Sequence, residues 1–204
     1  MKKILFTLAL LVSFCTIGQT AEDYIDRAES KYDAGDFYGA IEEYTKVIEL
    51  EPNESSEIYL EIGIIKDEEL KDHYGAIAAF SKAIELDPNN HEAYYEIGFA
   101  KYNLEDFKGA LADINFYLGL NLQLPGPYIY YVRGDIKAEL NDQYGAISDF
   151  SKAIELDPNY ADAFLLRGLS KYELGDMRGR CSDFIKASKL GNKYATDLYS
   201  KLCK

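Results

Sequence analysis

The sequence has no tryptophan, two histidines, two methionines and three cysteines. Histidine and cysteine supply most metal ligands and many catalytic groups, and the few present show no spacing typical of a metal site. A Gly-rich phosphate loop and a nucleophile motif are also missing from the sequence. We therefore expect a protein that is not an enzyme and that binds no metal and no cofactor. His73 and His91 are expected to be solvated, in a turn and at a helix start.

Basic residues are scarce as well, since 22 Lys and Arg stand against 35 Asp and Glu, which gives a net charge of −13. Nucleic-acid binding depends on clustered Lys and Arg that neutralise phosphates, so this balance argues against a nucleic-acid partner. An acidic protein favours basic or neutral partners instead.

A hydrophobic run long enough to cross a bilayer is absent too. The apolar run Ile4–Phe14 has eleven residues, whereas a spanning helix needs about 20, so no stable membrane insertion is expected. Lys2–Lys3 precede this run and the small residues of Thr16–Gly18 follow it, a pattern typical of a secretory signal peptide at residues 1–18. The sequence thus predicts an exported protein, periplasmic or secreted. A lipoprotein anchored at Cys15 is the alternative, although a bulky residue precedes that cysteine.

What the sequence does contain is a repeated stretch. FSKAIELDPN runs from Phe80 to Asn89 and recurs unchanged at 150–159, and the related YTKVIELEPN occupies 44–53. The copies begin 36 and 70 residues apart, a spacing that indicates a stacked-repeat architecture. Apolar residues in each copy fall on one face of a helix, and the acidic residue before proline ends that helix because it avoids the α region.

Numbering each repeat so that Ala40 is position 20 divides the chain into five repeats and a C-terminal helix. The repeats comprise residues 21–54, 55–90, 91–126, 127–160 and 161–192, and a capping helix is expected at 193–204. Position 4 is Tyr24, Tyr59, Tyr94, Tyr130 and Phe164; position 8 is Ala28, Gly63, Gly98, Gly134 and Gly168; position 20 is Ala40, Ala76, Ala110, Ala146 and Arg180; position 24 is Tyr44, Phe80, Ile114, Phe150 and Phe184. The second repeat has one extra residue near Glu68-Glu69, expected as a bulge or a longer turn.

This pattern resembles the tetratricopeptide repeat, over about 170 of the 204 residues. The resemblance implies an all-α fold, a right-handed superhelical solenoid of about five antiparallel helix pairs, A and B, with a capping helix. Small residues at positions 8 and 20 let the two helices approach, and aromatic rings at positions 4 and 24 fill the remaining space. Position 19 is glycine in every repeat, and because glycine costs about 1 kcal/mol in a helix interior, a close backbone contact is expected there.

Tetratricopeptide proteins usually bind partners on a concave face, through positions 2, 5, 9, 12 and 13 of helix A. The resemblance therefore implies an aromatic groove with an acidic rim, centred on the third and fourth repeats. Its expected residues are Tyr32, Tyr95, Phe99, Tyr102, Tyr128, Tyr131, Asp135 and Tyr172. Some of these side chains are expected to pack between neighbouring helices. The family's grip on a C-terminal carboxylate uses Lys, Asn and Arg, and the lack of Lys and Arg at these positions argues against that mode.

The sequence thus predicts an exported scaffold that binds a protein or peptide of unspecified identity in this groove. The alternative is a structural subunit of a permanent cell-envelope complex, whose groove is occupied from assembly onward. A free, monodisperse protein favours the scaffold, and insolubility without a partner favours the subunit.

Position 11 is a lysine in every repeat: Lys31, Lys66, Lys101, Lys137 and Lys171. These lysines form either a ladder of ion pairs with the surrounding carboxylates or a basic stripe for an anion. The excess of acidic residues favours the ladder.

Cys181 and Cys203 are the cysteines that remain after signal cleavage, and export places them where disulfides persist. An antiparallel helix pair that turns at Gly191-Asn192 brings residues 181 and 203 level, because 192 is their midpoint. We therefore predict a Cys181–Cys203 disulfide, with two free thiols as the alternative.

Overall fold

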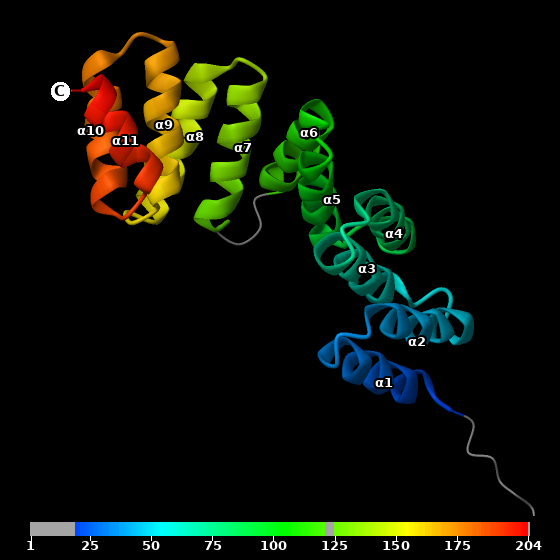
Figure 1. The fold of residues 1–204 in the computed structure, drawn as a ribbon. Coiled ribbons are helices and arrows are strands. Elements are labelled where there is room, and N and C mark those ends of the chain that lie inside the picture. Colours follow the sequence, from blue (N-terminus) through cyan, green and yellow to red (C-terminus); the bar gives the residue numbers. More distant parts are fainter. Residues whose placement is uncertain (1–18, 121–124, 204) are drawn as a thin grey trace, which may run out of the picture. The chain divides into compact units, whose positions relative to one another are not determined.

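A computed structural model describes residues 19–120 and 125–203 of the protein, and every element in these ranges is a helix (Figure 1). The predicted signal peptide and Cys15 lie outside the described residues. The helices A are α1 (Ala21–Asp33), α3 (Ser56–Ile64), α5 (His91–Asn103), α7 (Pro127–Glu139) and α9 (Ala161–Glu173). The helices B are α2 (Phe37–Leu50), α4 (His73–Leu86), α6 (Phe107–Gly119), α8 (Gln143–Leu156) and α10 (Met177–Lys189). A π-helix, η1 (Ile65–Glu69), follows α3, and α11 (Lys193–Leu202) is the last helix of the described residues.

The chain forms two compact units, one up to Glu51 and the other from Pro52. In the first unit, α1 packs against α2. In the second, each helix from α3 to α11 packs against the next one along the chain. No helix in the described ranges is both long and apolar enough to cross a bilayer.

Glycine at position 8 meets an aromatic ring at position 24 within three of the helix pairs. A Cβ on Gly63 would lie 2.3 Å from Phe80, and the same contact is 2.8 Å for Gly134 and Phe150 and 2.6 Å for Gly168 and Phe184. All three phenylalanines are fully buried. Any larger residue at these glycines would have to displace a ring from the core, which explains the small-and-large pairing of the two positions.

Glycine at position 19 has a different role from the one expected. Each helix B begins after an N-cap aspartate, and Asp36 accepts a hydrogen bond from the Gly39 backbone N–H at 3.0 Å. A Cβ on Gly39 would lie 2.0 Å from the Asp36 carboxylate, and a Cβ on each of the other four glycines would lie 2.0 to 2.3 Å from the carboxylate of its own capping aspartate. The predicted close backbone contact is therefore wrong: the glycine leaves room for the capping carboxylate of its own helix.

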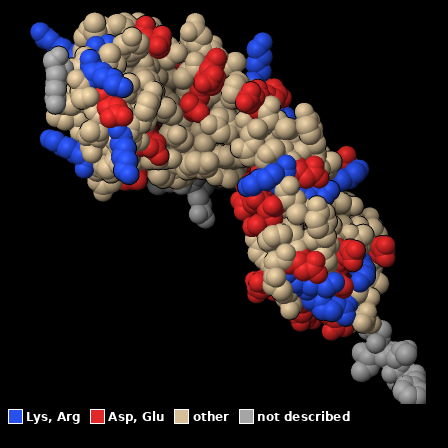
Figure 2. All heavy atoms as spheres, in the orientation of Figure 1, with Lys and Arg blue, Asp and Glu red and all other residues tan. Residues whose placement is uncertain are grey.

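The lysines at position 11 form ion pairs, as the ladder interpretation expects. Lys101 lies 2.6 Å from Asp113, Lys137 lies 2.7 Å from Asp149, and Lys171 lies 2.7 Å from Asp183. Lys31 makes the equivalent pair with Glu43 at 2.8 Å in the first compact unit. On the face drawn in Figure 2, Lys and Arg side chains accordingly lie among Asp and Glu side chains.

The extra residue of the second repeat is absorbed by η1, in which the Leu70 N–H donates to the Ile65 carbonyl, five residues back, at 3.2 Å. This is the bulge expected near Glu68-Glu69. Asp67, in the middle of η1, is buried and lies 2.6 Å from His73 Nδ1. The expectation that His73 is solvated is wrong, since its side chain is only 20 % exposed.

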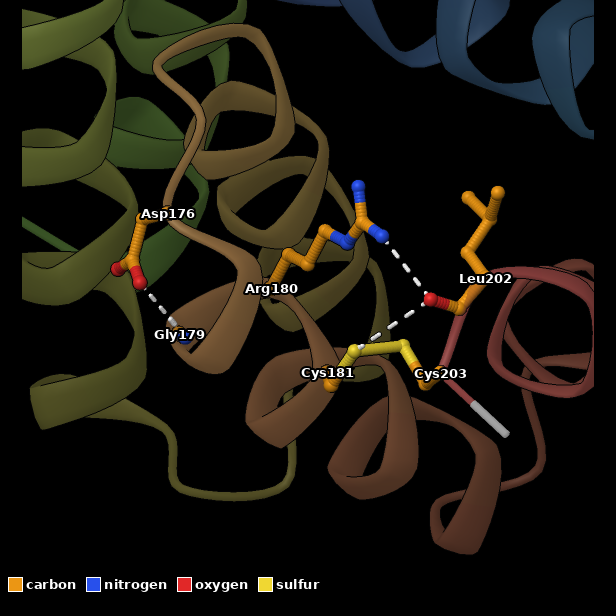
Figure 3. The surroundings of a disulfide bond; sticks show 6 residues. All are labelled: Asp176, Gly179, Arg180, Cys181, Leu202 and Cys203. Atoms are coloured by element: carbon orange, nitrogen blue, oxygen red, sulfur yellow. Dashed lines mark hydrogen bonds between the residues drawn. A yellow bond between two sulfur atoms is a disulfide. The ribbon is translucent and has the colours of Figure 1, made fainter.

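A disulfide joins Cys181 in α10 to Cys203 after α11, with Cα atoms 5.6 Å apart (Figure 3). Beside it, Arg180 occupies the position that is alanine in the other repeats. Its guanidinium donates a hydrogen bond from Nη2 to the Leu202 carbonyl at 2.9 Å. A charged hydrogen bond and a disulfide therefore both hold α11 against α10.

Candidate functional site

Five aromatic rings lie in contact across three helices A of the second compact unit. They are Tyr95 and Phe99 on α5, Tyr128 and Tyr131 on α7, and Tyr160 at the N-cap of α9. Successive ring centroids lie 4.5, 5.3, 6.2 and 5.0 Å apart in that order. These distances are typical of aromatic contacts. We call this set the aromatic row.

The rings of the row differ in exposure. Tyr128 is 50 % exposed, whereas Phe99 is 8 % exposed and belongs to a core cluster with Ile129 and Val132. Phe99 therefore supports the row from below, and the tyrosines form its surface.

The tyrosine hydroxyls of the row remain protonated at physiological pH. Partial burial, reinforced by nearby carboxylates, raises the pKa of Tyr95 and of Tyr131 to about 12. Burial also raises the pKa of Tyr128 and of Tyr160. Neutral hydroxyls can both donate and accept hydrogen bonds, which suits them to contact a polypeptide backbone.

A hydrogen bond beside the row joins α5 to α7. The Tyr102 hydroxyl donates to Asp135 Oδ2 at 2.5 Å, and burial together with this bond raises the pKa of Tyr102. Asp135 also lines a pocket of about 200 Å³, whose lining comprises Asp135, Ala138, Glu139, Gln143, Leu166, Leu169, Ser170 and Glu173. Carboxylates thus border the row at its α7–α9 side.

A second pocket, of about 240 Å³, lies among η1, α5 and α7 and is called the acidic pocket here. Its lining comprises Asp67, Glu68, Lys71, Tyr95, Glu96, Phe99, Asn103 and Tyr128. Burial, reinforced by the neighbouring charges of Glu68, Glu92 and Asp67, raises the pKa of Glu96 to about 7. Three rings of the aromatic row thus meet three carboxylates in one hollow.

Comparisons with known proteins identify the repeats of this fold. The family model described as TPR repeat matches residues 69–105 and 134–175. Among solved structures, a MamA protein is similar, with 28 % identity and a TM-score of 0.76 over 88 % of this chain and 96 % of that one.

The chain is a tetratricopeptide-repeat (TPR) protein.

Two further structures show the same TPR fold. A MamA fragment from Desulfovibrio magneticus RS-1 is 22 % identical, with a TM-score of 0.77 over 85 % of this chain and 96 % of that one. YrrB, described as a TPR protein with an unusual peptide-binding site, is 23 % identical, with a TM-score of 0.76 over 90 % and 92 %. No curated protein matches significantly. The predicted all-α TPR solenoid is confirmed.

Of the eight groove residues expected from the TPR resemblance, six lie together and two lie elsewhere. Tyr95, Phe99, Tyr102, Tyr128, Tyr131 and Asp135 lie together in and beside the aromatic row. Tyr172, on α9, lies against the Arg180 guanidinium, which is 4.8 Å from its ring centroid. Tyr32 lies in the first compact unit, where its ring centroid is 5.5 Å from that of Phe37.

Sequence reasoning missed Tyr160 and the three carboxylates of the acidic pocket. Tyr160 is the last residue of its repeat, outside the helix A positions that TPR proteins use. Asp67 and Glu68 do fall at the end of helix A, but the extra residue of the second repeat obscures their register. Glu96 follows Tyr95 directly, and a helical period does not put adjacent residues on one face.

No group of three or more His, Cys, Asp or Glu side chains within residues 19–120 and 125–203 is arranged to hold a metal ion.

Proposed function

We propose that this TPR protein is exported and that it binds a protein or peptide segment on the aromatic row. The observation that carries the proposal is the continuous series of rings on α5, α7 and α9, bordered by carboxylate-lined pockets. A segment lying on these rings would contact α5, α7 and the N-cap of α9 at once.

The chemistry of the row supports such binding. Tyrosine offers a large apolar face and a hydrogen-bonding hydroxyl, and it loses little conformational entropy on binding because it has only two rotatable side-chain bonds. Contacts among the rings already restrict them, and the Tyr102–Asp135 hydrogen bond fixes α5 against α7. A surface held in this way is organised before its partner arrives. The similar fold of YrrB, which has a peptide-binding site, is compatible with this role.

Binding is tested with peptides selected from a random library against the purified protein. Tyr128→Ala is the informative variant because this side chain is 50 % exposed and its loss leaves the core intact. We expect dissociation constants to rise tenfold or more, about 1.4 kcal/mol, as for a central aromatic anchor. Tyr144→Ala is the matched control, since Tyr144 is 77 % exposed on α8. Unchanged affinity of every selected peptide for a folded Tyr128→Ala protein would contradict the proposed surface.

Phe99 is a poor choice for the same experiment. Its 8 % exposure means that truncation creates a cavity in the core and confounds binding with folding.

Export is supported by Lys2–Lys3, the apolar run Ile4–Phe14 and the small residues at Thr16–Gly18. The Cys181–Cys203 disulfide is the kind of bond that persists outside the cytosol. The mass of the protein isolated from its host tests this: we expect a chain that begins after Gly18. A mass that includes Met1 would contradict export by cleavage, and a lipid on Cys15 would indicate a lipoprotein instead.

A further inference from the structure

The carboxylates that line the acidic pocket outnumber the basic side chains that line it. Asp67 is engaged, since it lies 2.6 Å from His73 Nδ1 and accepts a hydrogen bond from Asn103 Nδ2 at 3.4 Å. Within the described part of the chain, neither Glu68 nor Glu96 has a hydrogen-bond or ion-pair partner. Lys71 is the basic side chain of the lining, against three carboxylates.

Aromatic faces form the remaining wall of this pocket. Tyr95, Phe99 and Tyr128 all line it, and the Phe99 and Tyr128 rings are stacked with centroids 5.3 Å apart. The face of an aromatic ring carries partial negative charge and attracts a cation, most strongly where water is partly excluded. Rings and carboxylates in this pocket therefore favour the same kind of ligand.

The π-helix explains why the pocket occurs in this repeat. It absorbs one extra residue at the end of helix A, and two of its residues, Asp67 and Glu68, line the pocket. A short π-helix within an α-helix is rare and is often found at functional sites. The extra residue thus coincides with a hollow that its own carboxylates help to line.

We propose that the acidic pocket binds a lysine or arginine side chain of the segment that lies on the aromatic row. The inference rests on the proposed function, because Tyr95, Phe99 and Tyr128 belong to both the row and the pocket. A pocket of about 240 Å³ has room for one long side chain, whose alkyl stem lies along the rings while its charged end reaches Glu96 and Glu68. The partner is therefore a peptide segment with a basic residue, which agrees with the net charge of −13 of this chain.

The test uses two small probes and nuclear magnetic resonance. Nα-acetyl-lysine methylamide carries the ammonium group, and its Nε-acetylated form keeps the stem but loses the charge. Each is titrated into the purified protein. We expect the charged probe to shift the amide signals of η1 and α5, and to bind at least tenfold more tightly than the neutral probe.

Glu96→Gln and Glu68→Gln test the carboxylates separately, so that a folding defect in one variant leaves the other informative. Each should weaken binding of the charged probe by fivefold or more and leave the neutral probe unaffected. Glu155→Gln, an exposed carboxylate on α8, is the matched control and should change neither. Equal binding of the two probes, or unchanged binding by both pocket variants, overturns the inference.

The outcome separates this inference from the proposed function. One result is that the selected peptides depend on Tyr128 but bind Glu96→Gln and Glu68→Gln as tightly as the unaltered protein. The aromatic row would then remain a binding surface, and the inference that the partner has a basic residue would be wrong. Specific binding of the charged probe, with no selected peptide sensitive to Tyr128→Ala, would keep the pocket and contradict the wider surface.

Discussion

The fourth repeat and the second repeat hold helix A to helix B by different means. In the fourth, the buried Asp149 accepts hydrogen bonds from Arg133 at 2.8 and 2.6 Å and lies 2.7 Å from Lys137. The fifth repeat has the same arrangement, with Arg167, Lys171 and Asp183. In the second repeat the equivalent position of helix B is Ala79, and Lys66 instead lies 3.9 Å from the half-exposed Asp72.

This difference explains where the chain accommodates an irregular turn. An ion network of three side chains requires a fixed register between the helices, because a shift of either helix leaves a charge buried without its partner. The second repeat has no such network, so its helix A can take up an extra residue as η1. The acidic pocket lies at that point. Regular repeats thus hold the scaffold, and the irregular one offers a specific site.

The largest effect is expected from breaking the network of the fourth repeat. Asp149→Ala removes the carboxylate from Arg133 and Lys137, whose side chains are only 18 % and 19 % exposed. We expect the free energy of unfolding to fall by about 3–5 kcal/mol, since two cations remain partly buried and unpaired. Urea denaturation followed by circular dichroism measures it. Glu155→Ala, on the exposed face of the same helix, should cost less than about 0.5 kcal/mol, and equal costs for the two variants would refute the argument.

The fifth repeat is also joined to α11 by the Cys181–Cys203 disulfide, and the second repeat contains no cysteine. Cys203→Ser removes the disulfide, whose cysteines are 22 residues apart in the sequence, and should destabilise α11 by about 3 kcal/mol. Hydrogen exchange measures the effect by segment. We expect amides of α11 to lose protection while those of α4 do not change. Unaltered exchange in α11 would mean that Arg180 and packing suffice to hold it.

The acidic pocket should make stability depend on pH. The pKa of Glu96 is about 7 in the folded protein against an ordinary value of 4.5, so the folded state holds the proton more tightly. Stability from this group is complete below pH 4.5 and is lost as pH rises through 7. Facing groups are Asp67, Glu68 and Lys71 near η1, Glu92 and Tyr95 on α5, and Tyr128 on α7.

Glu96→Gln removes this titration. At pH 8 the variant should be more stable than the unaltered protein by about 1–2 kcal/mol, and at pH 4 the two should be alike. Denaturant midpoints at both pH values provide the measurement. A constant difference across the range would show that Glu96 does not titrate near neutrality.

The smallest effect concerns the turn between helices A and B. The fifth repeat has Gly175 at φ 76° in this turn, whereas the second repeat has Lys71 at φ 55°. A residue with a side chain is strained by about 1–2 kcal/mol in the left-handed region. Glycine avoids this strain, but it loses more conformational entropy on folding, which offsets part of the gain. Lys71→Gly should therefore stabilise the protein by about 0.5 kcal/mol, measured as a shift of the melting temperature. Lys71→Ala is the control and should give no such gain, because alanine keeps the strain.

Much of the fold could be predicted from the sequence because it depends on residues close together in the chain. The repeat period, the helix stops before Pro88 and Pro158, and the pairing of small position 8 with large position 24 are all readable from spacing. The same holds for residues 181 and 203, which lie equally far from one turn. Position 19 shows the limit of such reasoning: the sequence indicates that a glycine is required there, but its repeat pattern does not reveal that the reason is the capping aspartate three residues earlier.

The sequence by itself determined that this chain is a stack of helix pairs and which positions of helix A are aromatic. The tertiary structure alone decided that Phe99 is buried while Tyr128 is exposed, because burial depends on how one repeat packs against the next. It also brought Tyr160 onto the aromatic row and placed Glu68 beside Glu96, which are far apart in the sequence. The Phe99–Tyr128 and Glu68–Glu96 contacts join different repeats, and Tyr160 at the end of the fourth repeat contacts Tyr131 near its start. A pattern of positions along each repeat carries no information about such contacts.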